Sequence, residues 1–123
     1  MYEITVHSHF SGAHRLRYIH GKCEELHGHN WKVEASVVSN RLGKEGVVID
    51  FGILKQKVEK VLKLLDHTYL NDLPYFSGIE PSSENIAKYI FDRLKRELKG
   101  HPGSLKKVTA WESETSSATY FGK

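Results

Sequence analysis

The fold is decided by the stretch HGHNWKVEASVV, residues 27–38. Apolar and polar side chains alternate along it, and a period of two is typical of a β-strand with one buried face. The apolar residues on that face are Trp31, Val33, Ala35 and Val37. The same stretch opens with His27 and His29, which a strand directs to one face because they are two residues apart. We therefore expect one strand to contribute both to the core and to a functional site.

Periodic patterns on both sides of this stretch predict the other elements. Tyr2 to Phe10 also alternates, and Asp50 is a favourable N-cap for a helix whose apolar residues recur every three or four positions. Ser82 or Ser83 caps a second helix, which stops near Gly100. The predicted elements are strands at 2–10 and 27–38, a short extended return at 47–49, helices from 51 to about 65 and from 83 to near 100, and strands at 105–111 and 118–121.

The order strand, strand, helix, helix, strand, strand predicts an α+β fold with both helices on one face of the sheet. A chain of 123 residues without a linker or repeat is expected to form a single domain, residues 1–123. The composition, 39% hydrophobic and 27% charged, is that of an ordinary globular protein.

Charge and hydropathy exclude several partners. The net charge is +3 and the basic residues are interleaved with acidic ones, so we expect no nucleic-acid partner. No apolar run approaches the roughly 18 residues of a membrane span, so we expect no membrane association. The N-terminus carries Glu3 and alternates in polarity, which fits neither a signal nor a transit peptide. We expect a cytoplasmic protein.

Three histidines predict a metal site. If the first two strands pair, His14 at the end of the first lies across from His27 and His29. Three imidazoles with one open position are typical of catalytic zinc. A non-catalytic zinc-stabilised binding module is the competing interpretation, but structural zinc sites are usually closed by four ligands. His7 and His9 share the two-residue spacing, but we expect them on the solvated face.

Other residues near these histidines are candidates for proton transfer. Cys23, the only cysteine, precedes His27 by four residues, and a nearby cation would favour its thiolate form. The alternative interpretation is that Cys23 is an inert, buried thiol. Asp66 lies beside His67, and a carboxylate in that position can orient an imidazole for acid/base work. Glu112 ends the third main strand, where the pattern alone indicates surface charge.

At these residues the chain resembles the 6-pyruvoyl-tetrahydropterin synthase family, which includes the 6-carboxy-tetrahydropterin synthases. The resemblance runs nearly end to end and is specific as an ordered set. Its motifs are Phe10–Leu16 (FSGAHRL), Cys23–His29 (CEELHGH), Val48–Phe51 (VIDF), Leu65–His67 followed by Leu70–Asn71, Ser83–Asn85 and Trp111–Ser113.

The resemblance implies the T-fold (tunnelling fold), with an antiparallel four-stranded sheet in each subunit and active sites at subunit interfaces. The assembly it implies is a homo-oligomer, a hexamer of two trimers. It also implies zinc on the three histidines, Cys23 as the proton-abstracting thiolate, and His67 supported by Asp66 as a second acid/base group. Glu112 would anchor the pterin ring.

The implied reaction is that of a carbon–oxygen lyase. It acts on 7,8-dihydroneopterin triphosphate, eliminates triphosphate, and yields 6-carboxy- or 6-pyruvoyl-tetrahydropterin for queuosine or tetrahydropterin biosynthesis. The three residues between Cys23 and His27 match the 6-carboxy type. Glu24, however, resembles a branch proposed to cleave the side chain to 6-hydroxymethyl-7,8-dihydropterin for folate synthesis; the alternative is that Glu24 is an exposed loop charge.

Overall fold

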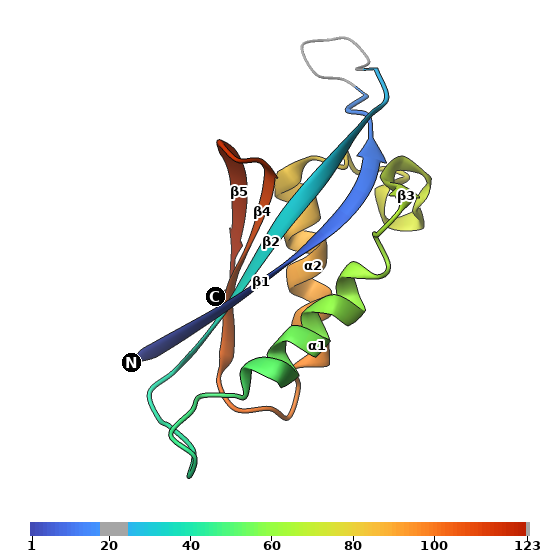
Figure 1. Cartoon of the computed structure of the whole chain (residues 1–123). Helices are drawn as coiled ribbons and strands as arrows, with labels where there is room; N and C mark the ends of the chain where they lie inside the picture. Colours follow the sequence, from blue (N-terminus) through green and yellow to red (C-terminus); the bar gives the residue numbers. More distant parts are fainter. Residues whose placement is uncertain (18–24, 123) are drawn as a thin grey trace.

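The computed structural model describes residues 1–17 and 25–122 as one five-stranded sheet with two α-helices packed on one of its faces (Figure 1). The strand order is β3-β1-β2-β4-β5. The elements are β1 (Tyr2–His14), β2 (His27–Ser39), α1 (Phe51–Leu62), β3 (Thr68–Tyr69), α2 (Ser83–Glu97), β4 (Ser104–Ser113) and β5 (Ser116–Phe121), with 3-10 turns at Leu70–Asp72 and Pro74–Phe76.

The α+β class and the two helices on one face are confirmed, but the strand count of four is wrong. The fifth strand, β3, has two residues and runs parallel to β1, pairing Gly12 with Thr68 and Ala13 with Tyr69. So short a strand carries no periodic signal. A Cβ at Gly12 would lie 3.4 Å from the Thr68 carbonyl oxygen, which is an ordinary van der Waals contact, so the pairing does not depend on this glycine.

Several elements also differ from the expectation; β1, for example, continues to His14 instead of ending at Phe10. Residues 47–49 form bends rather than a strand, and their last two side chains are buried beside the start of α1. Asp50 caps α1 as expected, since its Oδ1 accepts hydrogen bonds from the backbone N–H of Gly52 and of Ile53. The helix ends at Leu62, three residues before the predicted Leu65, and the chain then turns toward β1. Tertiary contacts at Asp66 and His67 explain this early end.

In the part of the chain that the structure describes, the outer edge of β1 is one of two open sides of the sheet, and β5 forms the other. Ser11 points its backbone N–H and C=O away from β2, toward Asp66 and His67 respectively. By alternation, Thr5, His7 and His9 direct their backbone groups the same way. Among the described residues β3 pairs only with Gly12 and Ala13, so the rest of this edge has no strand partner.

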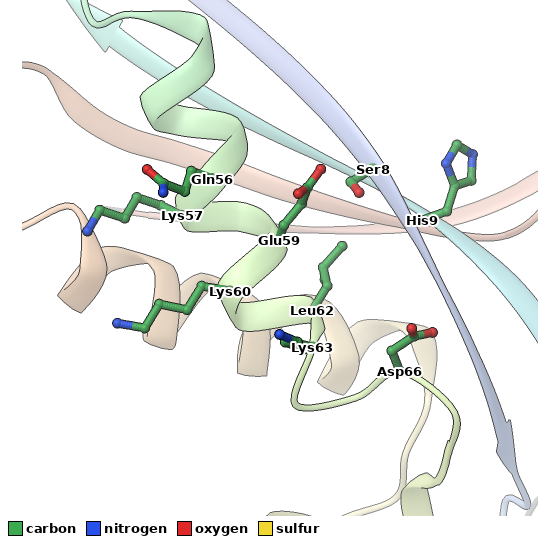
Figure 2. Close-up of a pocket in the computed structure, with 9 residues that line it drawn as sticks. All are labelled: Ser8, His9, Gln56, Lys57, Glu59, Lys60, Leu62, Lys63 and Asp66. Atoms are coloured by element: carbon green, nitrogen blue, oxygen red, sulfur yellow. The ribbon is translucent and has the colours of Figure 1, made fainter.

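A groove of about 660 Å³ runs along this open edge, between β1 and α1 (Figure 2). Ser8 and His9 line it from β1, Lys57 and Lys60 project from α1, and Lys63 follows directly after that helix. The groove ends at Asp66. The edge of the sheet and a polar helix face therefore form one continuous surface.

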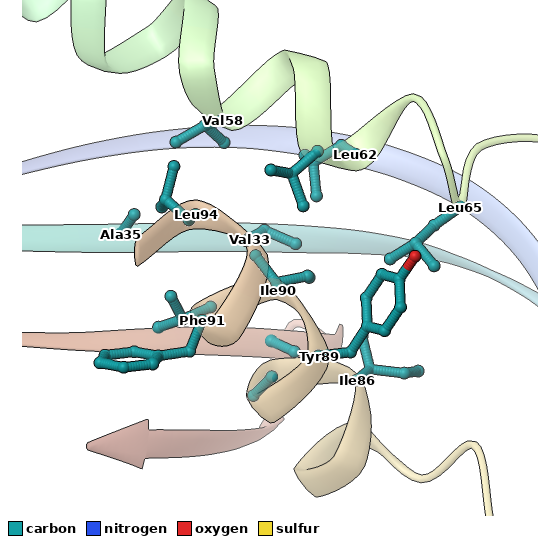
Figure 3. Close-up of a cluster of buried hydrophobic side chains, with 14 of the residues drawn as sticks. Val33, Ala35, Val58, Leu62, Leu65, Ile86, Tyr89, Ile90, Phe91 and Leu94 are labelled. Carbon is teal, nitrogen blue, oxygen red and sulfur yellow. The ribbon is translucent and has the colours of Figure 1, made fainter. Parts of the chain in front are cut away.

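The core fills the space between the sheet and the two helices (Figure 3). Within residues 27–38, the side chains that point into the core are the expected ones, and Trp31, Val33 and Ala35 are fully buried. Each large apolar side chain buried in this way contributes about 1.5–3 kcal/mol. His7 and His9 are exposed on the opposite face, as predicted. Among the described residues no helix is both long and apolar enough to cross a membrane.

Candidate metal centre and active site

Three histidines converge where β1 ends and β2 begins. The antiparallel register sets His14 directly opposite His27, and His29 follows on the same face of β2. The Nε2 atoms of His14 and His27 are 2.9 Å apart. The ring centroids of His14 and His29 lie 5.3 Å apart, and those of His27 and His29 4.7 Å apart. The predicted set of imidazoles is therefore brought together.

Backbone carbonyls determine which ring nitrogens face the centre. A carbonyl oxygen only accepts hydrogen bonds, so the nitrogen beside it must carry the hydrogen. His14 donates from Nδ1 to the Pro81 carbonyl at 2.7 Å, and His27 donates from Nδ1 to the Glu25 carbonyl at 2.9 Å. In the tautomer that carries its one hydrogen on Nδ1, Nε2 presents a lone pair to the centre, as a metal ligand does.

The donor set fits a zinc ion. Ligand atoms about 2.0–2.1 Å from a tetrahedral ion are roughly 3.4 Å apart. The separation of 2.9 Å between two imidazole nitrogens comes within half an ångström of that value. At this distance a hydrogen on either nitrogen makes the contact a hydrogen bond, and a metal ion bound between the two nitrogens would replace that hydrogen. Three imidazole ligands suit zinc.

Glu112 belongs to the same cluster, where pattern alone had indicated surface charge. Its Oε1 lies 3.3 Å from Nε2 of His14 and 3.5 Å from Nε2 of His29. One ligand atom from each of these three residues and His27 lies within 4.8 Å of the others. The carboxylate is 35% exposed, so it can also reach a bound molecule.

The sheet explains the position of Glu112. Lys32 of β2 pairs with Trp111 of β4, so the next residue, Glu112, lies on the face that carries Trp31 and His29. The pairing of β4 with β5 shifts by one residue at this point, and such bulges commonly re-aim a side chain beside an active site. Periodicity within one strand could not reveal this placement.

Trp31 forms the inner wall of the site. It is fully buried, its ring stacks on Phe10 with centroids 5.0 Å apart, and its edge contacts His14 and His29. His14 is itself only 1% exposed. Tight packing of this kind restricts the rotamers of the imidazoles, so the cluster is held in place before any ligand binds.

Asp66 and His67 form a second group on the open edge of β1. Asp66 Oδ1 accepts the Ser11 N–H at 2.9 Å, and this hydrogen bond is the main reason the pKa of Asp66 lies below its ordinary value of 3.8. Oδ2 lies 3.0 Å from Nδ1 of His67. The pair is formed as predicted.

The backbone and exposure of His67 set this group apart from the histidine cluster. Its φ of 56° is unusual for a residue other than glycine, and such conformations gather at functional sites. The side chain is 81% exposed. His67 and His29 both line a shallow depression of about 660 Å³ on the sheet, so the two groups border one surface.

Cys23 and Glu24, the two predicted bases, lie outside the described residues. Leu26, just after them, is exposed beside the first histidine of β2. Within the described part of the chain, the site thus consists of the His14/His27/His29/Glu112 cluster and the Asp66–His67 pair.

Comparisons with known proteins agree with this geometry. The 6-pyruvoyl tetrahydropterin synthase family matches residues 3–123. The 6-carboxy-5,6,7,8-tetrahydropterin synthase of Synechocystis is 45% identical over 118 residues, covering 91% of this chain and 87% of the relative. Human 6-pyruvoyl tetrahydrobiopterin synthase is 34% identical over 128 residues, covering 93% and 87%.

Solved structures show the same fold. Caenorhabditis elegans 6-pyruvoyl tetrahydropterin synthase superimposes with a TM-score of 0.86 at 31% identity, over 99% of this chain and 96% of that one. A Plasmodium vivax 6-pyruvoyltetrahydropterin synthase, solved as a variant in which a catalytic glutamate is replaced by alanine, gives 0.79 at 31% identity, over 97% and 96%.

These matches and the T-fold define the class: a pterin-metabolising lyase. The chain belongs to the 6-pyruvoyl tetrahydropterin synthase family. It is a tetrahydropterin synthase with a group of residues that can hold a metal.

Proposed function

We propose that this enzyme binds zinc and converts 7,8-dihydroneopterin triphosphate and water to 6-carboxy-tetrahydropterin, with release of triphosphate and of the other two side-chain carbons as acetaldehyde. The observation that carries the proposal is the convergence of three imidazoles from His14, His27 and His29. The 6-carboxy product is favoured by the three residues between Cys23 and His27 and by the 45% identity to a relative of that name.

Each group has a distinct part in this proposal. The imidazoles hold zinc, which when bound supplies a Lewis acid beside the hydroxyl groups of the substrate side chain. The Cys23 thiolate removes a proton from a side-chain carbon, and His67, oriented by Asp66, transfers the second proton. Glu112 accepts the N–H groups of the pterin ring, a charge-assisted pair of hydrogen bonds that fixes the orientation of the substrate.

We also propose that the enzyme works as a homohexamer of two trimers. The unpaired edge of β1 favours the addition of a strand from another subunit, because open edges are otherwise prone to uncontrolled association. The 81% exposure of His67 in one subunit fits an active site completed by a neighbour. A cytoplasmic location suits the proposal, since a single thiol stays reduced there.

The second candidate function is cleavage of the same substrate to 6-hydroxymethyl-7,8-dihydropterin. It is favoured by Glu24 directly after Cys23. A carboxylate at this position could take a different side-chain proton and so direct the reaction to carbon–carbon cleavage.

Product analysis distinguishes the two reactions. Wild type, Cys23→Ala and Glu24→Gln should be incubated with 7,8-dihydroneopterin triphosphate, and the pterin products identified by mass. We expect wild type to form 6-carboxy-tetrahydropterin, Cys23→Ala to lose it, and Glu24→Gln to keep it. If 6-hydroxymethyl-dihydropterin dominates in wild type and disappears only in Glu24→Gln, the cleavage function replaces the first proposal.

A further inference from the structure

A backbone carbonyl far along the chain holds the most buried histidine of the metal centre. His14 donates from Nδ1 to the carbonyl of Pro81, 67 residues later, and both residues are buried. This hydrogen bond directs the Nε2 lone pair to the centre. A shift of the Pro81 loop would release the ring, so whatever holds the loop also acts on the metal ligand.

Glu80, the residue before Pro81, ties this loop to the end of β1. Its Oε2 accepts the backbone N–H of Arg17 at 2.5 Å, and its Oε1 accepts Nη1 of Arg17 at 3.0 Å. Its own carbonyl accepts Nδ2 of Asn85 at 3.0 Å, in the first turn of α2. Glu80 therefore links the segment just after β1 to α2 at the position of Pro81.

Arg17 extends the connection over the rest of the loop. Its guanidinium also donates to the carbonyls of Phe76 and of Ile79, the latter at 3.3 Å. The side chains of Arg17 and Glu80 are only 23% and 32% exposed. Arg17 is three residues from His14, so the strand that carries this imidazole and the loop that orients it are joined by one ion pair.

We propose that Arg17 and Glu80 are positioning residues of the metal centre. They hold the Pro81 carbonyl against Nδ1 of His14 and so pre-orient Nε2 for the metal. Loss of a group that orients a metal ligand typically lowers metal affinity by about 10- to 100-fold. The inference rests on the proposed function only in requiring that His14 binds a metal.

Glu80→Gln is the sharpest variant, because it preserves size. Its amide offers one oxygen and one NH2 group to two N–H donors of Arg17, so one hydrogen bond becomes a contact between two donors. Arg17→Met removes the guanidinium altogether. Glu97→Gln is the matched control: Glu97 is 28% exposed and accepts from Lys60 at 3.0 Å, but it joins α1 to α2.

The experiment is titration of the metal-free proteins with Co²⁺ and Zn²⁺. We expect Glu80→Gln to raise the Kd by about 10- to 100-fold and to alter the visible spectrum of bound Co²⁺, with Glu97→Gln within about twofold of wild type. Arg17→Met should lower metal affinity by a similar factor. The double variant should lose no more affinity than either single variant, because the pair acts as a unit.

The outcomes separate this inference from the proposed function. Glu80→Gln with wild-type metal affinity and spectrum would overturn the positioning role while leaving the function intact. Equal losses in Glu80→Gln and Glu97→Gln would also overturn it, since the effect would then be general destabilisation. Thermal unfolding of the metal-free proteins measures that destabilisation independently. A wild-type protein that binds neither ion would refute the metal centre itself.

Discussion

Replacing Glu112 by glutamine tests whether this residue anchors the pterin or binds the metal. The substitution preserves shape but removes the charge next to His14 and His29. If Glu112 anchors the pterin, one hydrogen bond to the ring is lost and the other loses its charge. Three imidazole ligands remain, so we expect zinc to stay at about one ion per chain.

The expected decrease in kcat/KM of Glu112→Gln follows from the surroundings of the carboxylate. Removing a charge-assisted pair of hydrogen bonds costs about 2–4 kcal/mol, or roughly 30- to 900-fold in kcat/KM. Because the side chain is 35% exposed, water compensates part of this cost. We therefore expect a decrease near the lower end, about 30- to 100-fold.

Steady-state kinetics with 7,8-dihydroneopterin triphosphate and elemental analysis of the same samples provide the measurement. Glu114→Gln is the control, because Glu114 is exposed two residues further along and should retain wild-type kinetics. Wild-type kinetics in Glu112→Gln would refute the anchoring role. Loss of zinc together with activity would instead identify Glu112 as a metal ligand, and three imidazoles would then be too few to retain the ion.

Three other predictions concern the metal, the assembly and the Asp66 carboxylate. His27→Ala should lose activity and most of its zinc, whereas His9→Ala should keep both; full zinc in the first variant would exclude His27 as a ligand. Light scattering at micromolar concentration should show a hexamer or at least a trimer, and a sharp monomer peak would refute assembly through the β1 edge. Asp66→Asn should lower the melting temperature at neutral pH. Because the pKa of Asp66 is depressed on folding, this stabilisation is present above its ordinary value of 3.8 and disappears as the pH falls through the folded value. A pH-independent difference between the two proteins would contradict that account.

Much of the fold could be predicted because its signals are local. The alternation in residues 27–38 and the caps at Asp50 and Ser82 correspond to the observed β2, α1 and α2. The missed features depend on contacts distant in sequence. The two-residue β3 forms only because residues after α1 reach the edge of β1, and α1 stops early for the same reason.

In the candidate site, too, local features could be predicted from the sequence, whereas contacts distant in sequence could not. The sequence alone predicted that His27 and His29 share one face, because a two-residue spacing on a strand has one geometric outcome. Only the tertiary structure could place Glu112 beside His14, since this depends on the register between β4 and β2 and on a one-residue bulge. It also revealed the Pro81 carbonyl that orients His14. Backbone groups are the same in every residue, so only folding decides which carbonyl meets which imidazole.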